Sequence, residues 1–326
     1  MKVLVFFNNN VRWLGVKLLI KIHLLRHVIL MDKKNNLLEN CLELFSLNKI
    51  DRDIFSWTGK NVGWARVFGG QVMAQTLIAA YETIEKDHYA HSFHSYFLRP
   101  GQMDKPIIFT VDRIRDGKSF STRTVKAIQD GEAIFNCSVS FQKIEEGLEH
   151  QIEMPETPGP EDLKNELEIR KDMANAMNIP KENLPMFLRK REVEMRPVEI
   201  QDYSNPQKAP PYRNIWIRPE GTLPEDERIQ QAFLLYISDM GLLAAANNPH
   251  GINFLHKNLQ MASLDHAMWF HRKLNFNDWF LYSIDSPISG NSRGFTRGSM
   301  YTKEGNLVAS CTQEGLIRLW SEEKKE

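Results

Sequence analysis

The chain of 326 residues has few cysteines and no net charge. Its three cysteines, Cys41, Cys137 and Cys311, are far apart and form no CxxC pair, which predicts neither a disulfide framework nor a zinc site and favours a reducing compartment. The 41 basic and 41 acidic residues balance, so nothing in the overall charge points to nucleic acid or an anionic membrane as a partner. With 42% hydrophobic residues, the composition is that of a globular protein long enough for two domains.

The first thirty residues also lack features that would define their role. Five basic residues and no acid occur between Met1 and Met31, and the basic residues interrupt the apolar sequence too often for a membrane span. An amphipathic presequence is one interpretation. We favour the other, in which residues 1–30 are an upstream extension and the working protein begins near Met31.

Residues 31–145 have the pattern of one structural unit. Apolar spacing predicts a short helix over 37–47, and a second, strongly apolar helix over 67–84 begins with the small residues Gly69 and Gly70. This glycine pair belongs to no GxGxxG or GxxxxGK[ST] pattern, so we interpret it as a place where a sheet can approach a central helix closely rather than as a phosphate loop. The strand-like segments that follow are 91–101, 106–117, 119–131 and 133–142, with Asp-Gly turn signals.

The second half of the chain repeats this order of elements. Residues 146–197 contain several prolines and many charges and are predicted to link the two units, so the second unit covers 198–326. Thr222 and Glu225 form a capping-box signal before a helical pattern that runs to Met240. The strand-like segments after it are 261–272, 279–289, 293–306 and 307–320.

A shift of 174 residues aligns the two halves at the sequence level. It places Thr122 on Thr296, Arg123 on Arg297, Gly131 on Gly305 and Cys137 on Cys311. One buried helix followed by an antiparallel sheet is a hotdog unit. The prediction is therefore an α+β double hotdog, in which each of two tandem units has a central helix wrapped by an antiparallel β-sheet.

Several long motifs, in order, resemble the acyl-CoA thioesterase II family. They are VFGGQVMAQTLIAA, HSFHSYFLRPG, LLYISDMGLLAAANNPHG, SLDHAMWFH, RGFTRG and LVASCTQEGLIR, and the resemblance extends from about Asn36 to Trp320. It implies hydrolysis of fatty acyl-CoA to free fatty acid and CoA, with no organic cofactor and no metal.

The resemblance also implies three catalytic residues. Asp239 matches the aspartate of the family, and Gln313 matches its glutamine within TQEG. Ser263 matches the hydroxyl residue before DHAMWFH, where many bacterial relatives have threonine. We expect the three side chains to converge and to hold one water molecule.

This chemistry is reasonable because an oriented water can attack a thioester carbonyl if a base accepts its proton and a donor stabilises the oxyanion. Asp239 would be the base, Ser263 and Gln313 would orient the water, and a backbone N–H at a helix start would serve the oxyanion. Under the 174-residue shift, Val139 takes the place of Gln313 in the first half. We therefore expect one active site per chain, in the second unit.

Other interpretations remain open. His94 and His266 could support the site by contacting the catalytic residues from behind, although histidines in strands more often pack in a core. A hotdog acyl-thioester dehydratase or hydratase would need a histidine with an acid, and a non-catalytic acyl-CoA-binding sensor would keep the pocket but lose the water site. We also expect a homo-oligomer, no membrane span and, because the chain ends SEEKKE without an SKL signal, a cytoplasmic location.

Overall fold

The computed structural model describes the chain except for residues 1–36, 60–65, 274 and 322–326. The predicted extension 1–30 therefore lies outside the described residues. The helices and strands of the first part are α2 (Leu37–Glu43), β1 (Asn48–Asp51), β2 (Ile54–Trp57), α3 (Gly69–Tyr81), β3 (His88–Phe97), β4 (Ile107–Asp116), β5 (Phe120–Gln129) and β6 (Glu132–Lys143). Each predicted segment of the first unit is present, with its ends moved by a few residues.

The second part begins with η1 (Pro160–Asp162), α4 (Glu166–Ala176), α5 (Leu184–Phe187), β7 (Val193–Pro197) and β8 (Tyr212–Pro219). It continues with α6 (Glu227–Ser238), η2 (Leu242–His250), β9 (Leu259–Ser263), β10 (Asp265–Phe270), β11 (Phe280–Gly290), β12 (Arg293–Thr302) and β13 (Leu307–Leu319). The strand β7 lies inside the segment that we predicted to link the units, yet it pairs with β8 at the edge of the sheet.

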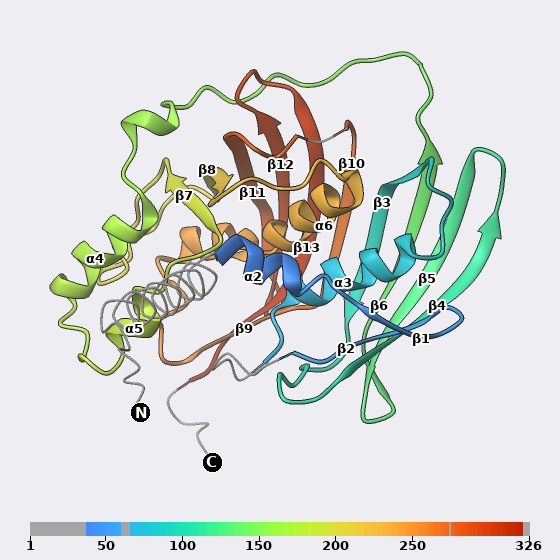
Figure 1. Cartoon of the computed structure of the whole chain (residues 1–326). Helices are drawn as coiled ribbons and strands as arrows, with labels where there is room; N and C mark the ends of the chain where they lie inside the picture. The colour runs from blue at the N-terminus through green and yellow to red at the C-terminus, as the bar shows by residue number, and fades with distance from the viewer. Residues whose placement is uncertain (1–36, 60–65, 274, 322–326) are drawn as a thin grey trace, which may run out of the picture.

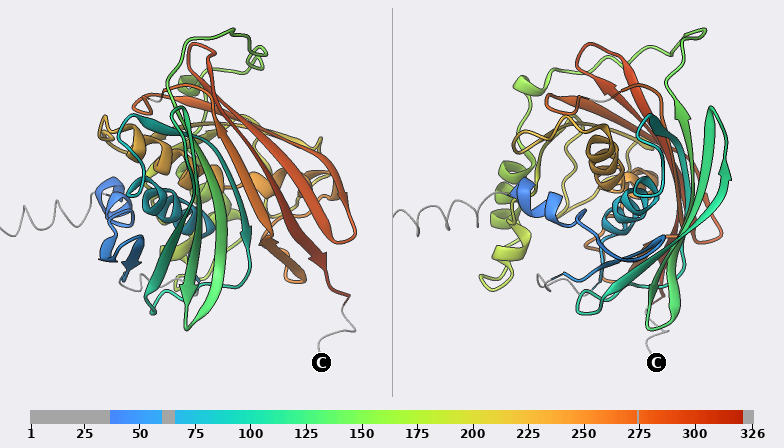
Figure 2. Two further views of the ribbon diagram at one scale, coloured as in Figure 1. Left: turned by 90° about the vertical axis from the view of Figure 1, so that its right-hand side faces the viewer. Right: turned by 45° about the vertical axis from the view of Figure 1, so that its right-hand side comes forward.

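The strands form one antiparallel sheet that curves around the two long helices. Its order is β1-β2-β4-β5-β6-β3-β10-β13-β12-β11-β8-β7, with β9 pairing to β13. The two units meet where β3 pairs with β10, at Phe93 opposite Met268. Figures 1 and 2 show α3 and α6 side by side within the curve of the sheet. This arrangement confirms the predicted double hotdog.

The central helices are the core of the molecule. All residues of α3 after Gly69 are buried, since its small residues let α6 pack closely against it. The helices run antiparallel, because the start of α3 contacts the end of α6 at Asp239 and the end of α3 contacts Gln231 through Tyr81. The segment Glu227–His250 is long and apolar enough to cross a membrane, but 72% of its most apolar window is buried inside the protein.

Two local predictions were wrong. The N-cap of α6 is Asp226, whose carboxylate accepts a hydrogen bond from the Arg228 amide, and Thr222 lies outside the helix. The predicted strand over 261–272 is divided into β9 and β10 at Leu264. Between the pairs Ser263–Gly315 and Ala267–Thr312 this strand has one residue more than β13, which is a β-bulge.

The repeat is real, but one shift does not describe all of it. Arg123 pairs with Val139 in the first unit, whereas Thr296 pairs with Gln313 in the second. The strands β6 and β13 therefore match at 174 residues and β5 and β12 at 173. The reason is a turn longer by one residue, 302–306 compared with 129–132. The identity of Arg123 and Arg297 consequently does not mark equivalent positions.

Candidate active site

Asp239 lies where the two central helices meet. It is the C-cap of α6, and its carboxylate faces the first turn of α3, so that Oδ2 accepts a hydrogen bond from the Gly70 amide at 3.0 Å. A helix N-terminus is a favourable place for a carboxylate. Burial nevertheless raises the pKa of Asp239, because desolvation outweighs the hydrogen bonds from Gln313, Gly70 and Ser263 that act to lower it.

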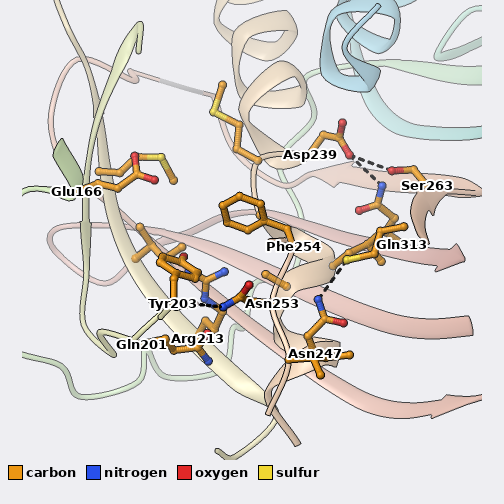
Figure 3. Close-up of a pocket in the computed structure, with 18 of the residues that line it drawn as sticks. Glu166, Gln201, Tyr203, Arg213, Asp239, Asn247, Asn253, Phe254, Ser263 and Gln313 are labelled. Atoms are coloured by element: carbon orange, nitrogen blue, oxygen red, sulfur yellow. Dashed lines mark hydrogen bonds between the residues drawn. The ribbon is translucent and has the colours of Figure 1, made fainter. Parts of the chain in front are cut away.

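Ser263 and Gln313 reach the same carboxylate from two strands. Gln313 in β13 donates from Nε2 to Asp239 Oδ1 at 2.9 Å, and the Ser263 hydroxyl at the end of β9 is 3.4 Å from the same oxygen. The β-bulge directly follows Ser263. The structure thus brings together the three residues that the sequence predicts to converge, as Figure 3 shows.

The amide of Gln313 is only half satisfied. Its side chain is buried, and its Oε1 atom has no hydrogen-bond partner within the described part of the chain. Gln313 Nε2 is oriented by Asp239, and Thr296 donates from its hydroxyl to the Gln313 backbone carbonyl at 3.2 Å. A buried acceptor without a partner beside a carboxylate is what a bound water molecule requires.

The two glycines at the start of α3 allow this close approach. A Cβ atom on Gly70 would lie 2.2 Å from the Tyr236 backbone oxygen, and one on Gly69 would lie 2.6 Å from Asp239 Oδ2. Neither distance is compatible with a side chain. The Gly69–Gly70 pair therefore serves helix–helix contact and access to Asp239, a role that the sequence indicated only as close packing.

The two histidines have different positions. His266 is fully buried, and its Nε2 is 3.0 Å from the Ser238 hydroxyl, which in turn donates to the Leu235 carbonyl. Burial lowers the pKa of His266 to about 3, so it is neutral and supports the end of α6 without touching Asp239. His94 is exposed on the outer face of the sheet, edge-on to Trp269, so the structure does not bring it to the cluster.

A GxSxG segment of the chain does not form the nucleophile elbow of a serine hydrolase. The segment Gly290–Gly294 matches the GxSxG pattern, but it is the turn between β11 and β12, with Ser292 at a φ of 57°. A nucleophile elbow requires a strand followed by a helix.

Side chains that could bind a metal ion gather at one place in the described part of the chain. Glu85 and Asp87 in the loop after α3 and His88 at the start of β3 have possible ligand atoms near one another, but both acids are exposed and Asp87 pairs with Lys143. This group is separate from Asp239. The expectation that no metal or organic cofactor takes part stays a prediction.

Two cavities meet at Asp239 and Ser263. The first, of about 350 Å³, lies between the end of α6, η2 and strands β7–β9, and Gln313 also lines it. The second, of about 300 Å³, lies between the start of α3 and the loop after β3, and Gly69 lines it. The sequence could not predict either cavity, because their walls come from helices, strands and loops far apart in the chain.

Two protein-family models match the chain. A family model described as acyl-CoA thioesterase matches residues 184–316, and one described as acyl-CoA thioesterase N-terminal domain matches residues 59–142. The chain is 38% identical to Acyl-CoA thioesterase 2 of Haemophilus influenzae over 87% of this chain and 99% of that protein.

Solved structures agree in fold. An acyl-CoA thioesterase II, TesB2, from Mycobacterium marinum is 35% identical, with a TM-score of 0.70 over 87% of this chain and 98% of that one. A protein with the hot dog fold from Alicyclobacillus acidocaldarius is 17% identical, with a TM-score of 0.69 over 86% of this chain and 99% of that one. The second likeness supports the fold alone.

Proposed function

The chain belongs to the acyl-CoA thioesterase family and hydrolyses acyl-CoA thioesters, and from this premise we propose that a water molecule held by Asp239, Ser263 and Gln313 performs the attack. The products are a free fatty acid and CoA. The observation that supports this mechanism is the convergence of the three side chains, with a buried, unpartnered Gln313 Oε1 beside the Asp239 carboxylate.

The water would donate one hydrogen to Asp239 and the other to Gln313 Oε1, which leaves a lone pair directed at the thioester carbon. Asp239 accepts a proton as the carbon–oxygen bond forms, and its raised pKa makes it a stronger base than an exposed aspartate. The carbon–sulfur bond then breaks, and the thiolate of CoA takes that proton back. The Ser263 hydroxyl, held only loosely at 3.4 Å, can turn toward the water.

The developing oxyanion needs a donor near Asp239. Backbone amides at the start of α3 point out of the helix, and Gly69 lines the second cavity beside Asp239 and Ser263. The Gly70 amide already binds Asp239, so we assign the oxyanion to the Gly69 amide.

The alternatives are less well supported. A dehydratase or hydratase would pair a histidine with an acid, but His266 binds Ser238 and is neutral at ordinary pH. A non-catalytic sensor would not need the three-residue cluster, which is complete here.

We further propose a cytoplasmic location and a homo-oligomer. All three cysteines are buried and unpaired, which fits a reducing compartment. The outer face of β3 exposes the ring of Tyr96 next to the joint between the units, and a second copy would bury this ring. Light scattering on the full chain measures the number of subunits, and a monomer at working concentration would contradict the oligomer.

The mechanism is tested by replacing Asp239 with Asn and measuring CoA release from short, medium and long acyl-CoA. Loss of the base should slow turnover by about 10²- to 10⁴-fold at every chain length. The replacement of Asp285, an exposed carboxylate paired with Arg297, by Asn is the matched control and should keep full activity.

Stability separates a catalytic loss from a folding defect. Because the pKa of Asp239 is raised in the folded state, its contribution to stability is present at low pH and is lost as pH rises through that pKa. The Asp239→Asn protein should therefore melt no lower than wild type at neutral pH. Unchanged turnover in this folded variant would exclude Asp239 as the base.

A further inference from the structure

The two cavities that meet at Asp239 and Ser263 both have mainly apolar walls, and they differ in the polar groups that line them. The second cavity has a mainly apolar wall with two arginines, Arg66 and Arg99, and Arg99 is paired with Glu132. Its apolar residues are Val67, Val72, Phe97, Leu98, Pro100, Ile134, Phe135, Ala262 and Leu264. A thioester at Asp239 has two arms, so each cavity can take one.

The first cavity becomes polar with distance from Asp239. Figure 3 shows Asp239, Ser263 and Gln313 at one end and Gln201, Arg213 and Asn247 at the other. The Arg213 guanidinium has no acidic partner among the described residues, and its Nη1 lies near Gly241. The Arg213 guanidinium can therefore bind a ligand.

Asn247 provides the sharper observation. Its side chain is 3% exposed, its Nδ2 donates only to the Met261 sulfur at 3.2 Å, and its Oδ1 has no partner in the described part of the chain. An alkyl chain packed against Asn247 and Arg213 would leave Asn247 Oδ1 unpaired and would take Arg213 out of water without offering a hydrogen bond, which is unfavourable. A ligand with amide donors and acceptors satisfies both.

We propose that the first cavity binds the pantetheine arm of CoA, with Asn247 and Arg213 as its recognition residues, and that the second cavity binds the acyl chain. This inference rests on the proposed function, because it takes the thioester to lie at Asp239. The pantetheine arm carries two amides and a hydroxyl, which can donate to Asn247 Oδ1 and accept from Arg213.

Distances along the ligand agree with this assignment. Met261 and Ser263 lie on the same face of β9, about 7 Å apart, and Asn247 contacts Met261. In an extended pantetheine arm the nitrogen of the second amide is seven bonds from the sulfur, about 8 Å, whereas the nearest phosphate is thirteen bonds away, about 15 Å. Asn247 is therefore at the depth of the second amide rather than of the phosphates.

Variants in each cavity test the assignment, together with substrates that are shortened on the CoA side or on the acyl side. Asn247→Leu removes the unpaired oxygen and should raise KM for every acyl-CoA roughly tenfold, with the same factor at all chain lengths. The factor should vanish with N-acetylcysteamine thioesters, which keep only the first amide. Asn136→Leu, which removes another buried unpartnered amide oxygen that lines neither cavity, should leave KM unchanged.

Ala262→Phe narrows the second cavity and should lower activity toward long acyl chains more than toward short ones, while Ala262→Ser should not. A chain-length effect of Asn247→Leu, a KM unchanged by it, or an effect that persists with the N-acetylcysteamine thioesters would overturn the assignment. If a polar group on the acyl chain were the true ligand of Asn247, its variant would discriminate among acyl groups instead.

Binding measurements keep this test independent of the proposed mechanism. Calorimetry with a non-hydrolysable acyl-CoA thioether on the Asp239→Asn protein should show a roughly tenfold weaker Kd when Asn247→Leu is added. Active Asp239→Asn protein would contradict the mechanism alone, whereas an unchanged Kd would contradict the cavity assignment alone.

Discussion

The two units of this chain carry different side chains at the same position of the fold. In the second unit the place between β12, β13 and the end of α6 holds Thr296, Gln313 and Asp239. In the first unit the matching place between β5, β6 and the end of α3 holds Arg123, Val139 and Thr83. Arg123 is 1% exposed and donates to the Thr83 hydroxyl and carbonyl, so its guanidinium fills the space that a water and substrate would need.

We propose that this difference leaves the duplicated fold with one active site. Both units retain the helix, the sheet and the turn glycines Gly131 and Gly305, each at positive φ. The buried guanidinium makes the first site a structural element, whereas the buried carboxylate and its half-satisfied amide leave the second site with unmet hydrogen bonds. Chemistry here depends on a few side chains rather than on the scaffold.

The largest expected effect is on stability in the first unit. Arg123→Met leaves the carbonyls of Thr83, Arg115 and Thr122 without their donor, and it should lower the free energy of unfolding by about 2–4 kcal/mol. Arg297, 57% exposed and paired with Asp285 at the surface, is the control, and Arg297→Met should cost at most about 1 kcal/mol.

Denaturant unfolding measures both variants. The kcat of folded Arg123→Met protein should stay near that of wild type, because Arg123 is not at the Asp239 site. Equal destabilisation by the two changes would show that the buried Arg123 guanidinium adds no more to stability than the exposed Arg297 guanidinium, and loss of kcat in folded protein would give the first unit a role in catalysis.

Making the second site resemble the first should slow catalysis, with a smaller change in free energy than the change in stability expected for Arg123→Met. Gln313→Val copies Val139 and deletes both the donor to Asp239 and the water acceptor, so kcat should fall about 10- to 100-fold, or roughly 1.4–2.7 kcal/mol. The reciprocal Val139→Gln should create no activity in an Asp239→Asn background, because Arg123 still occupies that site. Steady-state CoA release decides both, and activity restored by Val139→Gln would refute the single-site account.

The smallest effect is a single ionisation in the pH profile. Asp239 must be deprotonated to accept a proton, so kcat should fall as pH drops through its pKa, which burial places above the ordinary aspartate value. His266, with a pKa lowered to about 3, should add no limb near neutral pH. Rates measured from acid to neutral pH should give the same limb in wild type and Arg123→Met, and the same limb in the residual activity of folded Asp239→Asn protein would indicate another base instead.

Much of the fold follows from local sequence patterns. The central helix α3 and the hairpins with Asp130–Gly131 could be predicted, because apolar periodicity and positive-φ turn residues act over a few residues. The N-cap was misplaced because Thr222 and Asp226 are both good caps, and tertiary packing starts the helix at the second.

The site was predictable only through the motifs that carry Asp239, Ser263 and Gln313. The contact of Gly70 with Asp239 joins residues 169 apart in the chain, and no periodicity reports such a distance. The outward direction of the His94 side chain could have been predicted from the sequence, because its neighbours Phe93 and Ser95 alternate with it and face the core. The polar end at Arg213 and Asn247 comes from separate segments and needed the structure.

In the proposed mechanism Asp239 activates water rather than attacking the thioester itself. A single turnover with enzyme in excess of acyl-CoA, carried out in ¹⁸O-labelled water, distinguishes these cases. Direct attack by water predicts that the first fatty acid released carries one ¹⁸O atom and that the peptide containing Asp239 stays unlabelled. An unlabelled fatty acid, with ¹⁸O in the Asp239 carboxylate, would contradict the account and identify Asp239 as a nucleophile.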